Sequence, residues 1–188
     1  MPSTANFAET RKEQAKDHAK DGILIDAAVP RAQSRSGKYL TFSLASEEFG
    51  IRVLQVREIM GLQDITYVPQ TEPHIKGVIN LRGKVVPVIC LRTKFGMPEI
   101  EYTQRTCIVV VQVRGEDGLM LMGVVVDSVS EVITLNGSEI EDTPKFGTGQ
   151  DLGYILGMAK VRDRVKILID IEQVLTATEI SGLEHLRK

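Results

Sequence analysis

The chain has 188 residues, 43% of them hydrophobic, so it can bury the core of one sizeable domain or of two small ones. Its 23 Lys and Arg are offset by 25 Asp and Glu, and a net charge of −2 offers no broad basic field to release counterions from nucleic acid. We therefore expect a globular protein without a nucleic-acid partner.

Residues 1–36 differ in composition from the rest of the chain. They hold six Lys or Arg, five Asp or Glu and one short apolar stretch, so we expect a mobile tail outside the folded module. This segment has no signal-peptide core, and no apolar run reaches the roughly 18–20 residues that span a bilayer. The two cysteines, Cys90 and Cys107, lie within apolar runs, which favours reduced core thiols over a disulfide. These features predict a cytoplasmic protein.

From residue 38 onward, apolar and polar residues alternate with the period of a β-strand, as in “KYLTFSLAS”. Later runs are short, apolar and rich in β-branched residues, and glycines separate them. The pattern predicts a mainly β fold in which helices are accessories. The expected helical segments are residues 52–60, 91–95 and 171–175, and a C-terminal helix at residues 176–188.

The chain contains an internal repeat. Residues 75–91 lie over 155–171 when displaced by 80, and residues 50–59 lie over 123–132 when displaced by 73. The residues in register include Gly77 with Gly157, Arg82 with Arg162, Val56 with Val129, and Glu58 with Glu131. Chance agreement between β-rich stretches is the alternative. Because the segments occur twice in the same order, we infer two β units, about 38–103 and 104–175. Each would close as a small barrel, leaving a groove between them for a partner segment.

No constellation of catalytic or metal-binding residues stands out. The histidines, at positions 18, 74 and 185, are scattered, and none has a second ligand at metal-binding spacing. No serine lies in a nucleophile elbow, and no nucleotide-binding loop is present. Asp127 and Asp170 each follow a strand, where an aspartate usually caps the next turn. We expect no enzyme activity, no cofactor and no metal.

The stretch “KGVINLRGKVVPVICLR”, residues 76–92, closely resembles the CheW family of bacterial chemotaxis coupling proteins. The resemblance extends over residues 38–175. It includes a “V-x-E-I” motif at residues 56–59, interpreted as a short helix, the loop around Pro69, and “VVVDSVSEV” at residues 124–132, all in family order. It implies two SH3-like five-stranded barrels packed around a shared apolar interior.

The resemblance also implies a function. Family members are non-enzymatic adaptors that join the cytoplasmic tip of chemoreceptors to the regulatory domain of the histidine kinase CheA in signalling arrays. Two alternatives stay open. One is a CheW-like scaffold in a different receptor-kinase or motility pathway. The other is a small-molecule-binding or enzymatic barrel, which would need a polar pocket with perturbed titratable groups.

By resemblance, the coupling surface centres on the arginine of “NLRG”, Arg82, whose planar guanidinium can hold a carboxylate through two hydrogen bonds. Asn80 and Gly83 are expected to shape its turn. The further positions that the family implicates are Val56, Glu58 and Gly77 in the first unit, and Val129 and Val132 beside the same groove in the second.

Each of these residues also has a simpler interpretation. Arg82 would be a solvated turn residue, Glu58 a solvated helix acid, the valines core residues, and Gly77 a position with no room for a side chain. One residue departs from the family pattern, because Cys90 stands where an aspartate is usual. This substitution suggests a drier local environment.

Overall fold

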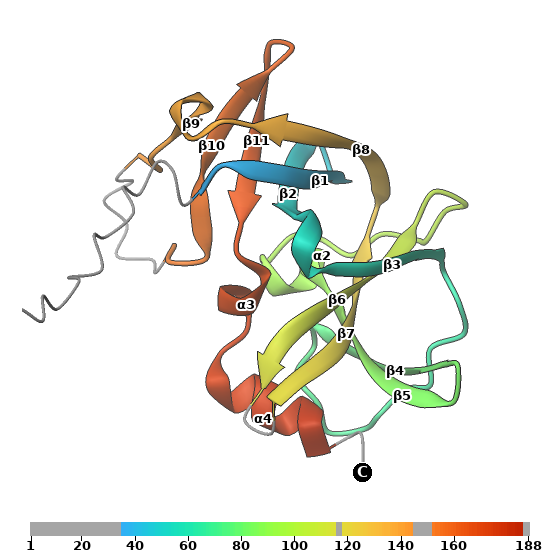
Figure 1. Cartoon of the computed structure of the whole chain (residues 1–188). Coiled ribbons are helices and arrows are strands. Elements are labelled where there is room, and N and C mark those ends of the chain that lie inside the picture. The colour runs from blue at the N-terminus through green and yellow to red at the C-terminus, as the bar shows by residue number, and fades with distance from the viewer. Residues whose placement is uncertain (1–34, 116–117, 145–151, 186–188) are drawn as a thin grey trace, which may run out of the picture.

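The computed structural model describes residues 35–115, 118–144 and 152–185 (Figure 1). The tail expected at residues 1–36 therefore lies almost wholly outside the described residues. The strands are β1 (Gly37–Leu44), β2 (Glu47–Arg52), β3 (Val56–Gly61), β4 (Ile75–Leu81), β5 (Lys84–Cys90), β6 (Cys107–Gly115), β7 (Gly118–Val126), β8 (Ser128–Leu135), β9 (Ile140–Glu141), β10 (Ile155–Val161) and β11 (Arg164–Ile169). The helices are α2 (Leu91–Lys94), α3 (Ile171–Val174) and α4 (Ala177–His185), with 3₁₀ turns η1 (Val53–Gln55) and η2 (Gly137–Glu139).

The strands form two sheets, in the orders β8-β1-β2-β11-β10-β9 and β3-β6-β7-β5-β4. Each sheet is an SH3-like barrel, so the predicted fold class is confirmed. The first sheet has six strands where five were predicted, because the two-residue strand β9 is added at its edge. We call the first the split barrel, because its strands come from two separate parts of the chain, and the second the central barrel. In Figure 1 the split barrel lies above the central barrel, and α3 and α4 lead from the split barrel down along the central one.

The barrels do not follow the division that we expected near residue 103. The split barrel combines β1 and β2 with β8 to β11, and the central barrel combines β3 to β5 with β6 and β7. The joining contacts are two parallel pairings, Gly50 opposite Leu168 and Gly123 opposite Val88, which are equivalent under the repeat. Each repeat unit therefore donates its first two strands to the other unit's barrel. Self-comparison of the sequence finds matching segments, but it carries no information on which of them pair.

An apolar core is shared between the barrels. Its buried side chains come from strands of both sheets and from α3, α4 and the start of α2. A column of stacked rings crosses it, with centroid separations of 6.0 Å from Phe42 to Phe49, 5.6 Å from Phe49 to Phe95 and 5.2 Å from Phe95 to Tyr154. Stacked pairs contribute about 0.5–1.5 kcal/mol each beyond the area they bury. Since Phe95 follows α2 of the central barrel, the column fixes the two barrels against each other.

The expected helices are present with one exception. Residues 91–94 and 171–174 form α2 and α3, and the C-terminal helix is α4. The helix expected at residues 56–59 is wrong, because Val56 begins β3 and only the preceding η1 is helical. Side chains of β3 alternate between half-buried and exposed, and the strand pairs with β6, so ladder hydrogen bonds outweigh the weak local helix preference. Among the described helices, none is long and apolar enough to cross a bilayer.

Candidate functional site

Arg82 lies at the tip of a two-residue turn between β4 and β5. Arg82 and Gly83 both have left-handed backbone conformations, with φ of 52° and 83°, as in the primed turns that fit tight hairpins. The Asn80 side-chain oxygen accepts a hydrogen bond from the Gly83 N–H at 2.8 Å, which fixes the turn from within. The turn-shaping roles predicted for Asn80 and Gly83 are confirmed. The turn holds the Arg82 backbone at the outer end of the hairpin.

The Arg82 side chain contacts Glu58 on β3. Its Nη2 donates a hydrogen bond to Glu58 Oε1 at 2.9 Å, with 78% of the arginine side chain and 30% of the glutamate side chain exposed. β3 and β4 are the two edges of the central sheet, so closure of the barrel brings these residues together. An ion pair this exposed stabilises the fold by at most about 1 kcal/mol. Arginine has five N–H donors, and this contact leaves others available to a partner.

Gly77 has a structural role behind the hairpin. It lies at a bulge in β4 with φ of 133°, and a Cβ there would come within 2.0 Å of the Thr66 carbonyl oxygen. The close approach allows Thr66 and Val78 to exchange two backbone hydrogen bonds, of 2.8 and 2.9 Å. Gly77 therefore has no room for a side chain, as its simpler interpretation holds, and it ties the loop after β3 to the hairpin.

The three valines fall into two groups. Val56 and Val129 are half-buried, and both pack against the core that the barrels share, Val56 opposite Val111 and Val129 opposite Phe42. This packing favours their interpretation as core residues. Val132 is 53% exposed and is available for contact. The structure thus brings Arg82 and Glu58 together, and it packs the half-buried Val56 and Val129 against the core.

A second arginine pair, to which we assigned no role from the sequence, occupies the equivalent place in the split barrel. Arg162 lies at the β10–β11 turn with φ of 50°, and its Nη2 is 3.5 Å from Glu131 Oε2 on β8. The signal for this pair was present in the repeat, where both residues fall in register with Arg82 and Glu58.

A largely buried ion pair connects the barrels. Arg92 donates from Nε and Nη2 to the two carboxylate oxygens of Asp127, at 2.7 Å each, and Asp127 also accepts the N–H of Ala45 at 2.7 Å. Asp127 therefore caps the β1–β2 turn of the split barrel while it holds α2 of the central barrel. Hydrogen bonding to this carboxylate raises the pKa of Arg92.

Cys90 is buried in the apolar cluster of the central barrel and lines a cavity of about 280 Å³. Charged residues such as Lys76, Arg92 and Asp127 line the same cavity, so the drier environment suggested by its departure from the family pattern stays a prediction. Cys90 and Cys107 are both free thiols. Within the described residues, no group of three His, Cys, Asp or Glu side chains is arranged to hold a metal ion.

The described residues thus form a protein of two SH3-like barrels, each with an arginine at the tip of one hairpin. The CheW-like domain family matches residues 38–179. Chemotaxis protein CheW of Klebsiella aerogenes is 36% identical over 151 residues, covering 80% of this chain and 89% of that protein. Chemotaxis protein CheW of Bacillus subtilis is 39% identical over 146 residues, covering 77% and 90%. The chain therefore belongs to the CheW-like domain family.

The fold agrees with a solved structure of the same family. The crystal structure of the scaffolding protein TtCheW from Thermoanaerobacter tengcongensis superposes with a TM-score of 0.67 at 33% identity. The match covers 77% of this chain and 90% of that chain.

Proposed function

We propose that this protein is a non-enzymatic chemotaxis adaptor that couples the signalling tip of chemoreceptors to the regulatory domain of the histidine kinase CheA. It acts in the cytoplasm, at arrays formed with membrane-bound receptors, and it needs no cofactor. Membership of the CheW-like domain family supports this role, because the curated relatives are named chemotaxis proteins and the solved relative is described as a scaffolding protein.

The observation that carries the proposal is the exposed guanidinium of Arg82 on the hairpin that the family resemblance singles out. It is 78% exposed, it is held by a rigid turn, and it retains donors beyond its bond to Glu58. Arginine at such a position can anchor a partner carboxylate, and arginine is enriched among residues that dominate binding energy. A hairpin tip held by the barrel positions that anchor more rigidly than a mobile loop would.

The residues that the family resemblance implicates have different tasks in this role. Arg82 and the exposed Val132 contact partners, whereas Glu58 orients the arginine. The remaining positions shape that surface. Asn80 and Gly83 fix the hairpin turn, Gly77 ties the neighbouring loop to the hairpin, and Val56 and Val129 pack against the shared core.

The test is a calorimetric titration of the full chain with a CheA regulatory domain and, separately, with a receptor signalling fragment. Arg82→Glu should weaken binding to at least one fragment by about tenfold or more, corresponding to about 1.4 kcal/mol. Arg114→Glu is the matched control, since Arg114 is an exposed strand arginine of the same barrel.

If the wild-type chain binds neither fragment while it melts cooperatively, the adaptor role with these partners is wrong. The chain would then be a CheW-like scaffold for a different receptor-kinase or motility pathway. Equal binding by Arg82→Glu and Arg114→Glu would remove Arg82 from the coupling surface while leaving the adaptor role intact.

A further inference from the structure

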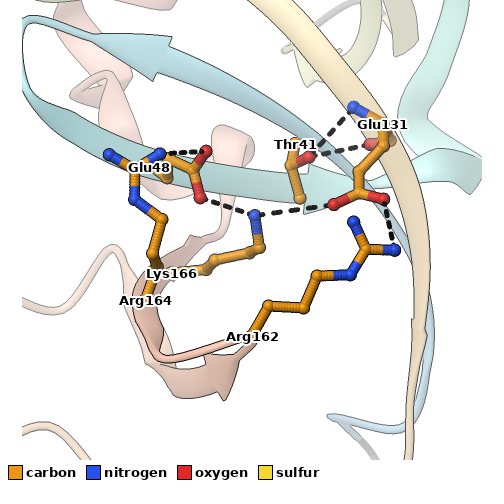
Figure 2. A network of polar contacts seen from close by, with 6 residues as sticks. All are labelled: Thr41, Glu48, Glu131, Arg162, Arg164 and Lys166. Atoms are coloured by element: carbon orange, nitrogen blue, oxygen red, sulfur yellow. Dashed lines mark hydrogen bonds and ion pairs between the residues drawn. The ribbon is translucent and has the colours of Figure 1, made fainter.

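The β10–β11 hairpin of the split barrel carries a basic residue at every second position: Lys160, Arg162, Arg164 and Lys166. The side chains of Lys160, Arg162 and Arg164 are 68%, 81% and 66% exposed, whereas that of Lys166 is only 4% exposed. Figure 2 shows Arg162, Arg164 and Lys166 reaching from this hairpin toward two glutamates on other strands. The hairpin thus has exposed cations on top and one buried cation beneath.

The two glutamates are Glu48 on β2 and Glu131 on β8. The buried Lys166 Nζ donates to Glu48 Oε2 at 2.6 Å and lies 3.9 Å from Glu131 Oε1. The hydrogen bond from Lys166 is the main cause that lowers the pKa of Glu48, so this carboxylate stays ionised. The exposed arginines make longer contacts, Arg164 with Glu48 at 3.3 Å and Arg162 with Glu131 at 3.5 Å.

The central barrel has no such arrangement at the equivalent positions. Displacement by 80 places Val86 at the position of Lys166, and displacement by 73 places Leu121 at the position of Glu48. Both belong to the apolar cluster of that barrel. Without a competing lysine, Glu58 holds Arg82 at 2.9 Å, whereas its equivalent Glu131 is shared between Lys166 and Arg162.

The buried lysine therefore leaves the arginines incompletely neutralised. Arg162, Arg164 and Lys166 share two carboxylates, and the remaining acid of the turn, Asp163, lies 3.3 Å from Lys160. Lys166 makes the shortest contact, 2.6 Å to Glu48, and therefore takes most of the neutralising charge of that carboxylate. The excess positive charge is left on the guanidinium groups of Arg162 and Arg164, whose contacts are longer. A guanidinium group that is only partly neutralised is stabilised by a further carboxylate, which it can bind through two parallel hydrogen bonds.

We propose that Arg162 and Arg164 form a second protein-binding surface, which takes an acidic segment of a partner protein. Carboxylates suit this surface better than polyphosphates do. Glu48 and Glu131 lie among the cations of this hairpin, so the hairpin presents no unbroken basic patch to a polyphosphate. The surface is on the other barrel from Arg82, and the proposal does not depend on the role of Arg82.

The experiment measures fluorescence anisotropy of labelled hexaglutamate with the full chain at low salt, and labelled hexaglutamine controls for the dye. Wild type should bind hexaglutamate well above hexaglutamine, and high salt should weaken that binding. The double variant Arg162→Gln/Arg164→Gln should weaken it about tenfold. Arg114→Gln, which removes one exposed arginine from the central barrel, should leave it unchanged.

Lys166→Met tests the role of the buried lysine. It removes the ammonium group that competes with the arginines for Glu48 and Glu131. Both glutamates should then form shorter ion pairs with Arg162 and Arg164, and hexaglutamate should bind more weakly. If this variant fails to fold, the exposed arginine variants still decide the proposal.

Three results would overturn it: equal binding of hexaglutamate and hexaglutamine, an equal loss in Arg114→Gln and in the double variant, or tighter binding of a six-nucleotide thymidine strand than of hexaglutamate. The last result would define a phosphate surface instead.

Discussion

The Arg82 guanidinium donates a hydrogen bond across 2.9 Å to the carboxylate of Glu58, which lies 24 positions earlier in the chain. The same pair recurs in the split barrel as Arg162 and Glu131, at 3.5 Å. The pair is therefore a feature of the repeat unit. The two copies differ in the other contacts of the glutamate, since only Glu131 also lies near a buried lysine.

Exchange of the two charges separates the arginine from the ion pair. The double variant Arg82→Glu/Glu58→Arg restores opposite charges at the same two positions, and its stability should stay within about 1 kcal/mol of wild type because both side chains are partly solvated. Its binding to receptor and kinase fragments should stay as weak as that of Arg82→Glu, because the partner requires a cation at the hairpin tip. Recovered binding in the double variant would mean that the ion pair, not the position of the arginine, matters.

The burial of the three valines predicts different costs for the same substitution. Val56→Asp and Val129→Asp each place a carboxylate against the shared core and should destabilise the fold by about 1–3 kcal/mol, seen as a lower Tm. Val132→Asp introduces the same charge at a side chain that is 53% exposed and should change stability by less than about 0.5 kcal/mol. Normal melting of the first two variants together with weakened receptor binding would instead place Val56 and Val129 on an open groove.

Gly77→Ala should destabilise the protein strongly. The new Cβ would lie 2.0 Å from the Thr66 carbonyl oxygen, and the backbone has a φ of 133° that L residues rarely adopt. We expect a loss of about 2 kcal/mol or more in the free energy of unfolding, measured by urea denaturation. Gly61→Ala is the control, because a Cβ there meets nothing within 4 Å and its φ is not positive. Similar midpoints for both variants would contradict this account of Gly77.

His74 predicts a pH dependence of stability. Its side chain is 9% exposed, and its Nε2 lies 2.9 Å from Oε1 of Glu179, which also accepts from Lys94 at 2.6 Å. Burial, followed by the charge of Lys94, lowers the pKa of His74 below its ordinary value of 6.5, although Glu179 acts in the opposite direction. The unfolded chain therefore takes up this proton at a higher pH than the folded chain does.

The sign follows from that difference. The contribution of His74 to stability is fully present above about pH 6.5 and is lost as the pH falls toward the lower folded pKa. The Tm should fall between about pH 7.5 and pH 5.5, and His74→Gln should reduce the slope. Glu179 joins α4 to this site, so the protection of the α4 amides against hydrogen exchange, relative to the intrinsic rate at each pH, should decrease as the pH falls over this range. An unchanged slope in His74→Gln would show that other groups cause the pH dependence.

The features that the sequence by itself determined, the strands and the hairpin turn, depend on interactions between neighbouring residues. Alternating apolar residues marked most of the strands, because the side-chain period of a strand is two wherever one face is buried. Asn80 and Gly83 predicted their turn because an Asx hydrogen bond and a positive φ are properties of a few neighbouring residues. The one local error was the helix at residues 56–59. The side chains of β3 alternate between half-buried and exposed, which is the period of a strand and not of a helix.

The contacts that only the tertiary structure decided are those between distant strands. The exchange of strands between the barrels depends on the pairing of Gly50 with Leu168 and of Gly123 with Val88. Lys166 meets Glu48 across 118 positions of sequence, although its alternating basic neighbours suggest only a solvated hairpin. The physical reason is that several strand orders bury the same alternating faces equally well. The choice among them depends on how whole sheets pack against a common core, which no local pattern encodes.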